Sequence, residues 1–350
     1  MGGREDTVPP VRARLRDLGH SVGELPPGPR NALVDVPGVR VGHRTLVEGD
    51  DVRTGVTAVL PHGGNVYAEK VLGACHVING YGKAAGLTQL EELGTVESPI
   101  LLTSTLSVGP VWEGGLRHLL ERNPWAARDR DTLNVIVGEC YDGWLSDARG
   151  LHVRSEHALE AIGAAREDEV SEGAVGAGTG TGCFGYKAGI GTSSRLIEGG
   201  QVLGCFVVAN YGARHELPLL TGHPAPDGGD DLPQGGSIMI LLGTDAPLSE
   251  RQLRRLAARA ALGLGRAGSV GANASGEYAI AFSTAHRVPH RLGDGYAEFR
   301  FLRDDARATR QLFRAAVEAT QEAVLNSLCV AEETGGRDGH VLPAFPHELL

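Results

Sequence analysis

The chain has 350 residues and a mass of 36.7 kDa, a length that fits one large layered domain or two domains of medium size. Its composition, 41 % hydrophobic and 22 % charged, excludes a disordered chain, because enough apolar surface can be buried to offset the ordering entropy. The formal net charge of −10 disfavours a sequence-independent hold on phosphate groups, so we expect no nucleic-acid partner.

β-Branched runs interrupted by glycine predict short strands joined by tight turns between Leu33 and Leu60. Four further strands are predicted at Ile100–Thr105, Leu133–Val137, Val202–Ala209 and Ile238–Leu242. A helix is predicted to follow Ser249, whose hydroxyl can cap its first turn. A longer helix is predicted over Asp304–Cys329, with two aspartates at its positive end. Strands in groups with helices between them predict a layered α/β or α+β domain.

The segment from His223 to Gly236 interrupts this pattern. It holds three prolines, four glycines and three aspartates in fourteen residues, a composition typical of an exposed loop. A buried strand, SIMILLG, begins directly after it at Ser237. Composition alone favours a surface loop or linker here, and the second interpretation is a processing site.

The chain starts with MGGREDTVPP, which has no apolar stretch, and no run of 18 apolar residues follows. This predicts neither a signal peptide nor a membrane span, and hence no membrane partner. Five cysteines are spread widely without a C-x-x-C pair, which is typical of reduced thiols, and we expect a cytoplasmic protein. They are Cys75, Cys140, Cys183, Cys205 and Cys329.

Familiar ligand motifs are weak or missing. Gly180–Gly185 matches G-x-G-x-x-G but lies in a longer glycine-rich run with no strong strand before it and no helix after it, which disfavours a nucleotide site. His286 and His290 are four residues apart, but Pro289 between them disfavours the helix that would align them as metal ligands. No G-x-S-x-G element is present either, so we expect no α/β-hydrolase triad, no metal and no cofactor.

The Gly236-Ser237 pair has the residue types of an amino-terminal nucleophile. Glycine can adopt the strained dihedrals that expose its carbonyl carbon to the serine hydroxyl, which allows an N-to-O acyl shift followed by hydrolysis of the ester. Cleavage would free an α-amine with an ordinary pKa of about 7.7–8.0, so that near neutral pH it can serve as general base for its own hydroxyl. A Gly-Ser pair is nevertheless common and does not establish this chemistry.

Several motifs make the case more specific. They are NALVDVPGVRVGH, RTGVTAVLPHG, INGYGK, GECYDGWLSD, GAGTGTGCFGYKAGIGTSSR, ANYG, GGSIMILLGTDAPLS and NASGEYAIAFSTA. In this order, from Asn31 to Val330, the chain resembles the L-aminopeptidase/D-amidase-esterase (DmpA) family, which includes the β-peptidyl aminopeptidases. The resemblance implies an αββα sandwich like that of amino-terminal-nucleophile hydrolases, with different strand connectivity. It also implies a single domain, residues 1–350, made as a precursor (zymogen) that cleaves itself into an alpha chain, 1–236, and a beta chain, 237–350. The alpha/beta pairs would form a homo-oligomer, typically of four.

The resemblance also implies roles for individual residues. Ser237 would be both the self-cleavage residue and the nucleophile. Asn210 in ANYG would be the oxyanion-hole donor, although N-Y-G is equally typical of a turn with positive φ. Ser275 and Glu277 in NASGE would lie beside the nucleophile and hold the amine and hydroxyl in register. Without the family, a surface turn ending in a solvated glutamate is the simpler interpretation of those two.

The resemblance further places Glu139 and Tyr141 of GECYDG in the pocket for the substrate's free amino group, where a carboxylate would pair with an ammonium. Without the family they read as a strand end and a turn. Lys83 in INGYGKAAG departs from the pattern, since an acidic residue is expected there. A cation beside this pocket would disfavour an ammonium ligand.

The expected function is therefore a cofactor-free serine aminopeptidase or amidase that releases an amino-terminal residue from small peptides, amides or esters through an acyl-enzyme on Ser237. The alternatives are an endo-acting hydrolase of the nylon-oligomer type and an acyltransferase of the ornithine acetyltransferase kind, although those relatives use threonine as the new terminus. A non-catalytic small-molecule binding protein of the same fold is the remaining alternative. The motifs do not indicate whether the released residue is a D-, L- or β-amino acid.

Overall fold

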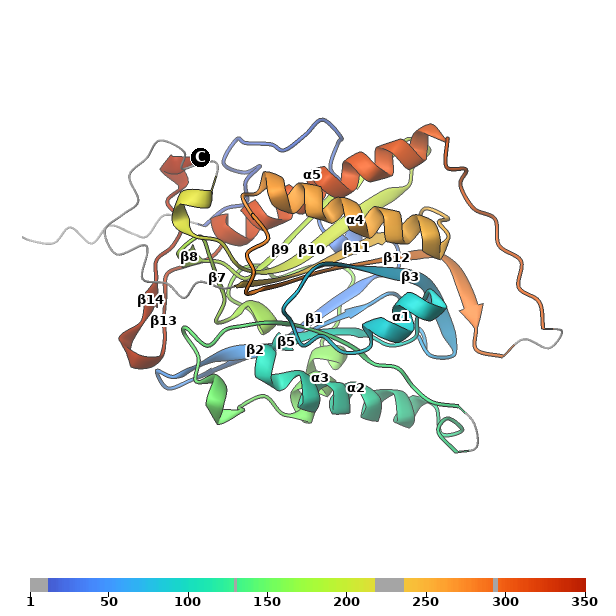
Figure 1. The fold of residues 1–350 in the computed structure, drawn as a ribbon, viewed down its shortest axis with the longest axis horizontal. Helices are drawn as coiled ribbons and strands as arrows, with labels where there is room; N and C mark the ends of the chain where they lie inside the picture. The colour runs from blue at the N-terminus through green and yellow to red at the C-terminus, as the bar shows by residue number, and fades with distance from the viewer. Residues whose placement is uncertain (1–11, 129–130, 218–235, 292–294) are drawn as a thin grey trace, which may run out of the picture.

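Two β-sheets stack face to face, and a pair of helices covers the outer face of each, so that the layers follow the order helix, sheet, sheet, helix (Figure 1). The computed structural model describes residues 12–128, 131–217, 236–291 and 295–350. Helices α4 (Glu250–Arg266) and α5 (Arg307–Cys329) cover the larger sheet, and α2 (Val108–Arg122) and α3 (Ser155–Gly163) cover the smaller one.

The smaller sheet has four strands in the order β1-β2-β5-β6. Their bounds are β1 Arg40–Glu48, β2 Val52–Leu60, β5 Ile100–Ser104 and β6 Ile136–Cys140. The β5–β6 pair is parallel and the other pairs are antiparallel. A parallel pair needs a crossover connection, and here that connection contains α2.

The larger sheet has six strands in the order β4-β3-β12-β11-β10-β9. Their bounds are β3 Glu69–Gly80, β4 Thr95–Val96, β9 Ile190–Leu196, β10 Val202–Asn210, β11 Gly236–Thr244 and β12 Ser275–Pro289. Its central pair, β11 and β12, is parallel and is joined through α4. The shorter α-helix and strands are α1 Leu87–Leu93, the pair β7 Gly182–Cys183 and β8 Tyr186–Lys187, and the pair β13 Thr334–Gly335 and β14 Val341–Leu342.

Alternation along β11 divides its side chains between two apolar layers. Ile238 and Ile240 pack toward α4 and α5, whereas Met239 and Leu241 pack between the sheets. Side chains two residues apart in a strand share a face, so Ser237 faces the space between the sheets together with Met239. This alternation decides which groups the Ser237 hydroxyl can reach.

Most of the predicted elements are confirmed, with shifted ends. The strand predicted at Leu133–Val137 begins later, at Ile136, and Leu33–Asp35 forms a 3-10 turn instead of a strand. The Asp35 carboxylate explains the turn, because it accepts hydrogen bonds from the N–H groups of Arg30 and Ala32 and so closes the backbone on itself. The loop predicted at 223–236 lies outside the described residues except for Gly236.

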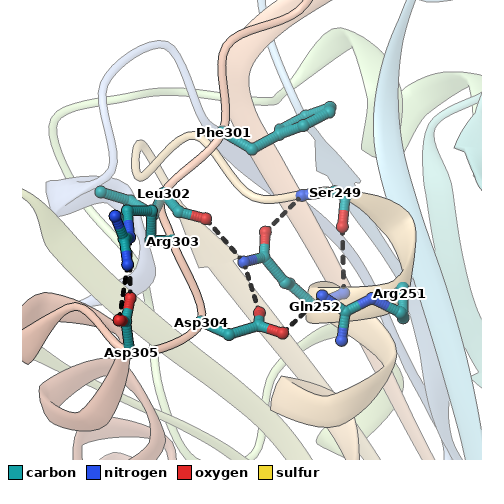
Figure 2. Close-up of a pocket in the computed structure, with 8 residues that line it drawn as sticks. All are labelled: Ser249, Arg251, Gln252, Phe301, Leu302, Arg303, Asp304 and Asp305. Carbon is teal, nitrogen blue, oxygen red and sulfur yellow. Dashed lines mark hydrogen bonds and ion pairs between the residues drawn. The ribbon is translucent and has the colours of Figure 1, made fainter.

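The start of α4 is confirmed, while that of α5 is not. Ser249 accepts the N–H of Gln252 at 3.3 Å, as the predicted cap requires. α5 begins at Arg307, so Asp304 and Asp305 precede it. The side-chain amide of Gln252 in α4 donates to the Leu302 carbonyl oxygen and to the Asp304 carboxylate. These hydrogen bonds connect the segment before α5 to α4, beside a shallow surface pocket of about 420 Å³ (Figure 2).

None of the helices in the described residues is both long enough and apolar enough to span a membrane. Over the same ranges, no three His, Cys, Asp or Glu side chains gather as a metal site would require.

Candidate active site

Strand ends from both sheets meet at one edge of the molecule. In the larger sheet, β11 and β12 begin where β10 and β3 end, and Asn210 is the register partner of Ser237. Ser275, the first residue of β12, is the partner of Gly236. β6 of the smaller sheet ends nearby at Cys140 and packs on β11. The topology therefore brings Ser237, Asn210 and the residues after β6 together from distant parts of the chain.

The Ser237 hydroxyl is buried, with 2 % of the residue exposed, and polar donors surround its oxygen. The backbone N–H of Tyr141 donates to Ser237 Oγ at 3.0 Å, and Asn210 Nδ2 lies 3.5 Å from the same atom. The Cys140 thiol contacts it as well, and burial raises the pKa of that thiol, so it stays protonated. Two N–H donors converging on one hydroxyl oxygen are suited to stabilising negative charge that develops nearby.

The orientation of the Asn210 amide is set from its other end. The Gly182 N–H donates to Asn210 Oδ1 at 3.1 Å, which turns Nδ2 toward Ser237. Asn210 is the last residue of β10, and the positive φ of the N-Y-G turn falls on Gly212 (+84°). The interpretation of Asn210 as the residue that makes this turn is therefore wrong.

Ser275 and Glu277 form a hydrogen-bonded pair on β12. Ser275 Oγ and Ser269 Oγ each donate to Glu277 Oε1 at 3.0 Å. Glu277 is only 1 % exposed, so the alternative of a solvated glutamate in a surface turn is wrong, and burial raises the pKa of its carboxyl. Within the described ranges, Glu277 Oε2 has no hydrogen-bond partner.

This pair and the Ser237 hydroxyl lie on opposite faces of the sheet. Glu277 is the register partner of Ile238, which packs toward the helices, whereas Ser237 faces the space between the sheets. Among the described residues, no hydrogen bond joins Ser275 or Glu277 to Ser237 Oγ. Ser275 instead stands beside the Gly236–Ser237 peptide bond, through its register with Gly236.

The Glu139 carboxylate is buried two residues before the Tyr141 amide that reaches Ser237. It accepts the Lys83 backbone N–H at 3.0 Å and the Thr105 hydroxyl. The Lys83 ammonium turns away, toward the carbonyl oxygen of Tyr81 at 3.3 Å and over the Tyr81 ring. The cation that departs from the family pattern therefore contributes its backbone N–H, not its charge, to Glu139. The Tyr141 side chain is 44 % exposed.

Sequence reasoning missed several groups at this site. Asn79 donates to the carbonyl oxygens of Ser275 at 2.6 Å and Ala272 at 2.8 Å, which holds the start of β12. Asn79 lies within the motif INGYGK and Cys140 within GECYDG, so these family motifs could have identified both residues as site candidates. Ser269 lies outside every quoted motif.

Asp142 is a second buried carboxyl near Glu139. The Thr54 hydroxyl donates to it at 2.5 Å and the Ser104 hydroxyl at 2.7 Å. Burial is the largest cause that raises the pKa of Asp142, to about 6, and the charge of Glu139 acts in the same direction. Through these two hydrogen bonds, Asp142 links Thr54 of β2 to Ser104 at the end of β5. Asp142 is the residue that follows Tyr141 in the chain.

Comparisons with known proteins agree with this fold. The model of peptidase family S58 matches residues 31–342. Two curated β-peptidyl aminopeptidases are similar, from Sphingosinicella microcystinivorans (37 % identical) and Sphingosinicella xenopeptidilytica (38 %), with 96 % of this chain and 90 % of each relative covered.

Solved structures are similar along nearly the whole chain. The PH0078 protein of Pyrococcus horikoshii is 45 % identical with a TM-score of 0.89, and 96 % of this chain and 97 % of that one are covered. The L-aminopeptidase D-Ala-esterase/amidase of Ochrobactrum anthropi, described as a new variant of the Ntn-hydrolase fold, is 34 % identical with a TM-score of 0.88, and 96 % of each chain is covered. The predicted layered fold is thereby confirmed, and the chain belongs to peptidase family S58.

Proposed function

We propose that this chain is a self-processing serine aminopeptidase that releases an amino-terminal residue from small peptides, amides or esters through an acyl-enzyme on Ser237. Membership of family S58 makes it a hydrolase, so the non-catalytic binding protein is no longer an alternative. The observation that carries the proposal is the setting of Ser237: a buried hydroxyl, second in a central strand, with the Tyr141 N–H and the Asn210 amide at its oxygen.

Maturation would use the Ser237 hydroxyl within its own chain. Oγ attacks the Gly236 carbonyl carbon, the C–N bond between the two residues breaks, and the freed nitrogen takes the hydroxyl proton. Water then hydrolyses the ester, which leaves the Gly236 carboxylate on chain 1–236 and restores the hydroxyl on chain 237–350. The proposed cut supplies the base for later turnover, since an α-amine has an ordinary pKa of about 7.7–8.0.

In turnover, this α-amine accepts the Ser237 hydroxyl proton while Oγ attacks the substrate carbonyl carbon. Negative charge passes to the carbonyl oxygen, where the Asn210 amide is a suitable donor. The leaving amine takes a proton, and water hydrolyses the acyl-enzyme. Ser275 and Glu277 would hold the new amine, a role supported by the register of Ser275 with Gly236 and by the unpartnered Oε2 of Glu277.

The substrate's own amino group would bind Glu139, with Tyr141 beside it. Support comes from the burial of this carboxylate and from the absence of the Lys83 ammonium among its described contacts. The curated relatives named β-peptidyl aminopeptidases make peptides with amino-terminal β-residues one substrate class to test. The proposed assembly is an oligomer of alpha/beta pairs, four together.

The deciding experiment follows maturation and turnover on the same preparations. Wild-type protein should give two chains with the masses of 1–236 and 237–350 and should release p-nitroaniline from aminoacyl p-nitroanilides. Ser237→Ala should stay one chain and show no release, because it lacks the attacking oxygen. An intact wild-type chain that still hydrolyses these substrates would contradict the mechanism.

Acetylated substrates separate the aminopeptidase from the endo-acting alternative. If Glu139 binds an ammonium, acetylation should sharply lower kcat/KM, since the carboxylate loses its charged partner. Panels of D-, L- and β-aminoacyl anilides, each free and acetylated, make the comparison within one residue type. Equal turnover of both forms would favour an endo-acting hydrolase.

A further inference from the structure

The glycine-rich segment Gly176–Gly185, which has no structural context for a nucleotide, lies against the smaller sheet. The N–H groups of Gly176 and Ala177 donate to the hydroxyls of Thr45 at 2.9 Å and Thr57 at 3.1 Å. Gly180 packs so closely that a Cβ there would lie 2.1 Å from the Arg53 carbonyl oxygen. The glycines are therefore needed for close backbone contact, and the segment is anchored on β1 and β2.

The far end of the same segment holds the end of β10. The Gly182 N–H donates to Asn210 Oδ1 at 3.1 Å, and the Phe184 N–H donates to the Tyr211 carbonyl oxygen at 2.9 Å. Phe184 adopts a positive φ (+53°) and is fully buried against the Tyr211 ring. Gly182 and Phe184, two residues apart, thus fix both the side chain of Asn210 and the backbone that follows it.

Lys187 is the group that ties this segment together. It is fully buried, and its Nζ donates to the carbonyl oxygens of Gly178 at 3.0 Å, Thr181 at 2.8 Å and Ala188. Within the described residues, its three hydrogen bonds all go to neutral carbonyl groups, and burial lowers the pKa of Lys187 to about 7. Lys187 is also the β-bridge partner of Gly182.

A lysine without a counter-ion in a fully buried site costs desolvation free energy that a neutral side chain would avoid. Its three N–H donors are matched by three acceptors, which come from both sides of Gly182 along the chain. These three hydrogen bonds to one ammonium group fix the direction of the backbone N–H groups between the residues that accept them. The group that benefits is the Gly182 N–H, one residue beyond the Thr181 carbonyl that Lys187 holds.

We propose that Lys187 is a positioning residue for catalysis: by binding the Gly178, Thr181 and Ala188 carbonyl oxygens, it fixes the Gly182 N–H that aims the Asn210 amide at Ser237. The inference rests on the proposed oxyanion role of Asn210. Among the described residues, the Lys187 ammonium makes its hydrogen bonds to these three carbonyl oxygens and none to Ser237, so the proposed effect on turnover passes through Asn210.

Replacement of the ammonium predicts a specific kinetic signature. Lys187→Met removes the Nζ donor from three carbonyl oxygens and leaves only longer hydrogen bonds to two of them, from the Thr181 hydroxyl to Gly178 at 3.2 Å and from the Ala188 N–H to Thr181 at 3.4 Å. The segment then relaxes, and the Asn210 amide loses its fixed orientation. Because an oxyanion donor acts on the transition state more than on the bound substrate, kcat should fall at least about tenfold while KM stays within about twofold. Lys70→Met is the matched control. It removes a mostly buried ammonium that pairs with Glu97 at the start of β3, away from the site, and should leave kcat unchanged.

A double-mutant cycle decides whether Lys187 acts through Asn210. Wild type, Lys187→Met, Asn210→Ala and the double variant are assayed with one aminoacyl p-nitroanilide, normalised to cleaved protein. We expect the double variant to lose little beyond Asn210→Ala alone. Losses that multiply would overturn the proposal, as would a Lys187→Met variant with lowered thermal stability and unchanged kcat. If Asn210→Ala alone keeps wild-type kcat, the oxyanion assignment fails instead, which is a distinguishable result.

Two further variants keep the test decisive where Lys187→Met does not fold. Lys187→Gln retains two N–H donors without the charge and should show a smaller loss of kcat that is again non-additive with Asn210→Ala. Gly182→Ala disturbs the same N–H from the opposite side, because its Cβ would lie 2.5 Å from Leu342 Cδ1. Gly182→Ala should lower kcat with KM little changed. Wild-type kcat in both variants would overturn the proposal.

Discussion

At the scale of single residues, burial rather than residue type distinguishes the candidate site residues from ordinary turn residues. Asn, Ser and Glu are common in turns, and the motifs ANYG and NASGE fit turns as well as catalytic elements. The structure places Asn210 at a strand end with both amide atoms engaged, and it buries Glu277 almost completely. A buried carboxyl one residue along the register from the proposed cleavage site requires an explanation that a solvated one does not.

Asn210→Ala should separate maturation from turnover. Loss of one oxyanion donor typically lowers kcat by about 10²–10³, whereas self-cleavage is a single intramolecular event with hours in which to finish. We therefore expect a largely cleaved but nearly inactive protein, measured by gel mobility and p-nitroaniline release. Cleaved Asn210→Ala protein with unchanged assembly and turnover within a few-fold of wild type would show that the oxyanion assignment is wrong.

Asp142 should make stability depend on pH. Its pKa of about 6 lies above the ordinary value near 3.9, so between these values the folded protein keeps a proton that the unfolded chain has lost. The resulting stabilisation is complete below about pH 4 and disappears as pH rises through 6, a change on the order of 2 to 3 kcal/mol. In Asp142→Asn this dependence should be missing.

Thermal melting between pH 4 and 7 measures the effect. The Tm of Asp142→Asn relative to wild type should rise with pH across this range, because only the wild type loses stability through ionisation of this group. Asp50→Asn, at the exposed turn between β1 and β2, provides the control substitution. A constant difference in Tm between Asp142→Asn and wild type would contradict the prediction.

At the scale of elements, close contacts between backbones decide where glycine is required. Gly191 lies in β9 under α5, and a Cβ there would lie 1.9 Å from the Ala323 carbonyl oxygen and 2.8 Å from the Ser327 nitrogen. Gly265 lies in α4 with nothing within 4 Å of such a Cβ. The two glycines differ in surroundings although both belong to regular elements.

Alanine at these positions should therefore change stability in opposite directions. Gly191→Ala should lower the free energy of unfolding by about 1–3 kcal/mol or more, since helix backbone must move. Gly265→Ala should raise it by about 0.5–1 kcal/mol through helix propensity. Denaturant unfolding of both variants is the measurement, and equal effects would show that the β9–α5 contact adapts without cost.

The elements also show what the sequence could and could not predict. β11 and α4 were predictable, because one is a compact apolar run and the other combines a cap with helical periodicity. β3 and β12 were not predicted, although they form the longest pairing of the larger sheet. Both have buried stretches in which residues on the two faces are apolar or small, so no alternation marks them. The proposed role of Ser237 came from the family motifs. The contacts of Ser237 with Tyr141 and of Asn210 with Gly182 could not be predicted, because they depend on the meeting of separate strands.

At the scale of the whole molecule, the proposed cut would leave two interleaved chains. Strands β3, β4, β9 and β10 belong to 1–236, and the central β12 and all of β11 except Gly236 belong to 237–350. Arg195 of β9 adds buried ion pairs to Glu318 at 3.2 Å and Glu322 at 2.7 Å of α5. The division therefore runs through the middle of the larger sheet, and both helices that cover it, α4 and α5, belong to 237–350.

The two chains should consequently remain associated after cleavage. We expect a single species in gel filtration that contains both chains in equal amounts and that separates only in denaturant, together with loss of activity. Arg195→Met should weaken this association, because two buried carboxylates then lose a charged partner. Spontaneous separation of wild-type chains in native buffer would contradict the prediction.

The position of β11 and β12 between β3 and β10 also has a consequence during synthesis of the protein on the ribosome. When synthesis reaches residue 236, the residues of β3 and β10 have been made but those of their partners β12 and β11 have not, so each strand presents an open row of backbone donors and acceptors. Such unpaired edges invite aggregation. Translation as one polypeptide delivers the missing strands to the same molecule within seconds at high local concentration. Two separate genes for the same pieces would lack that protection.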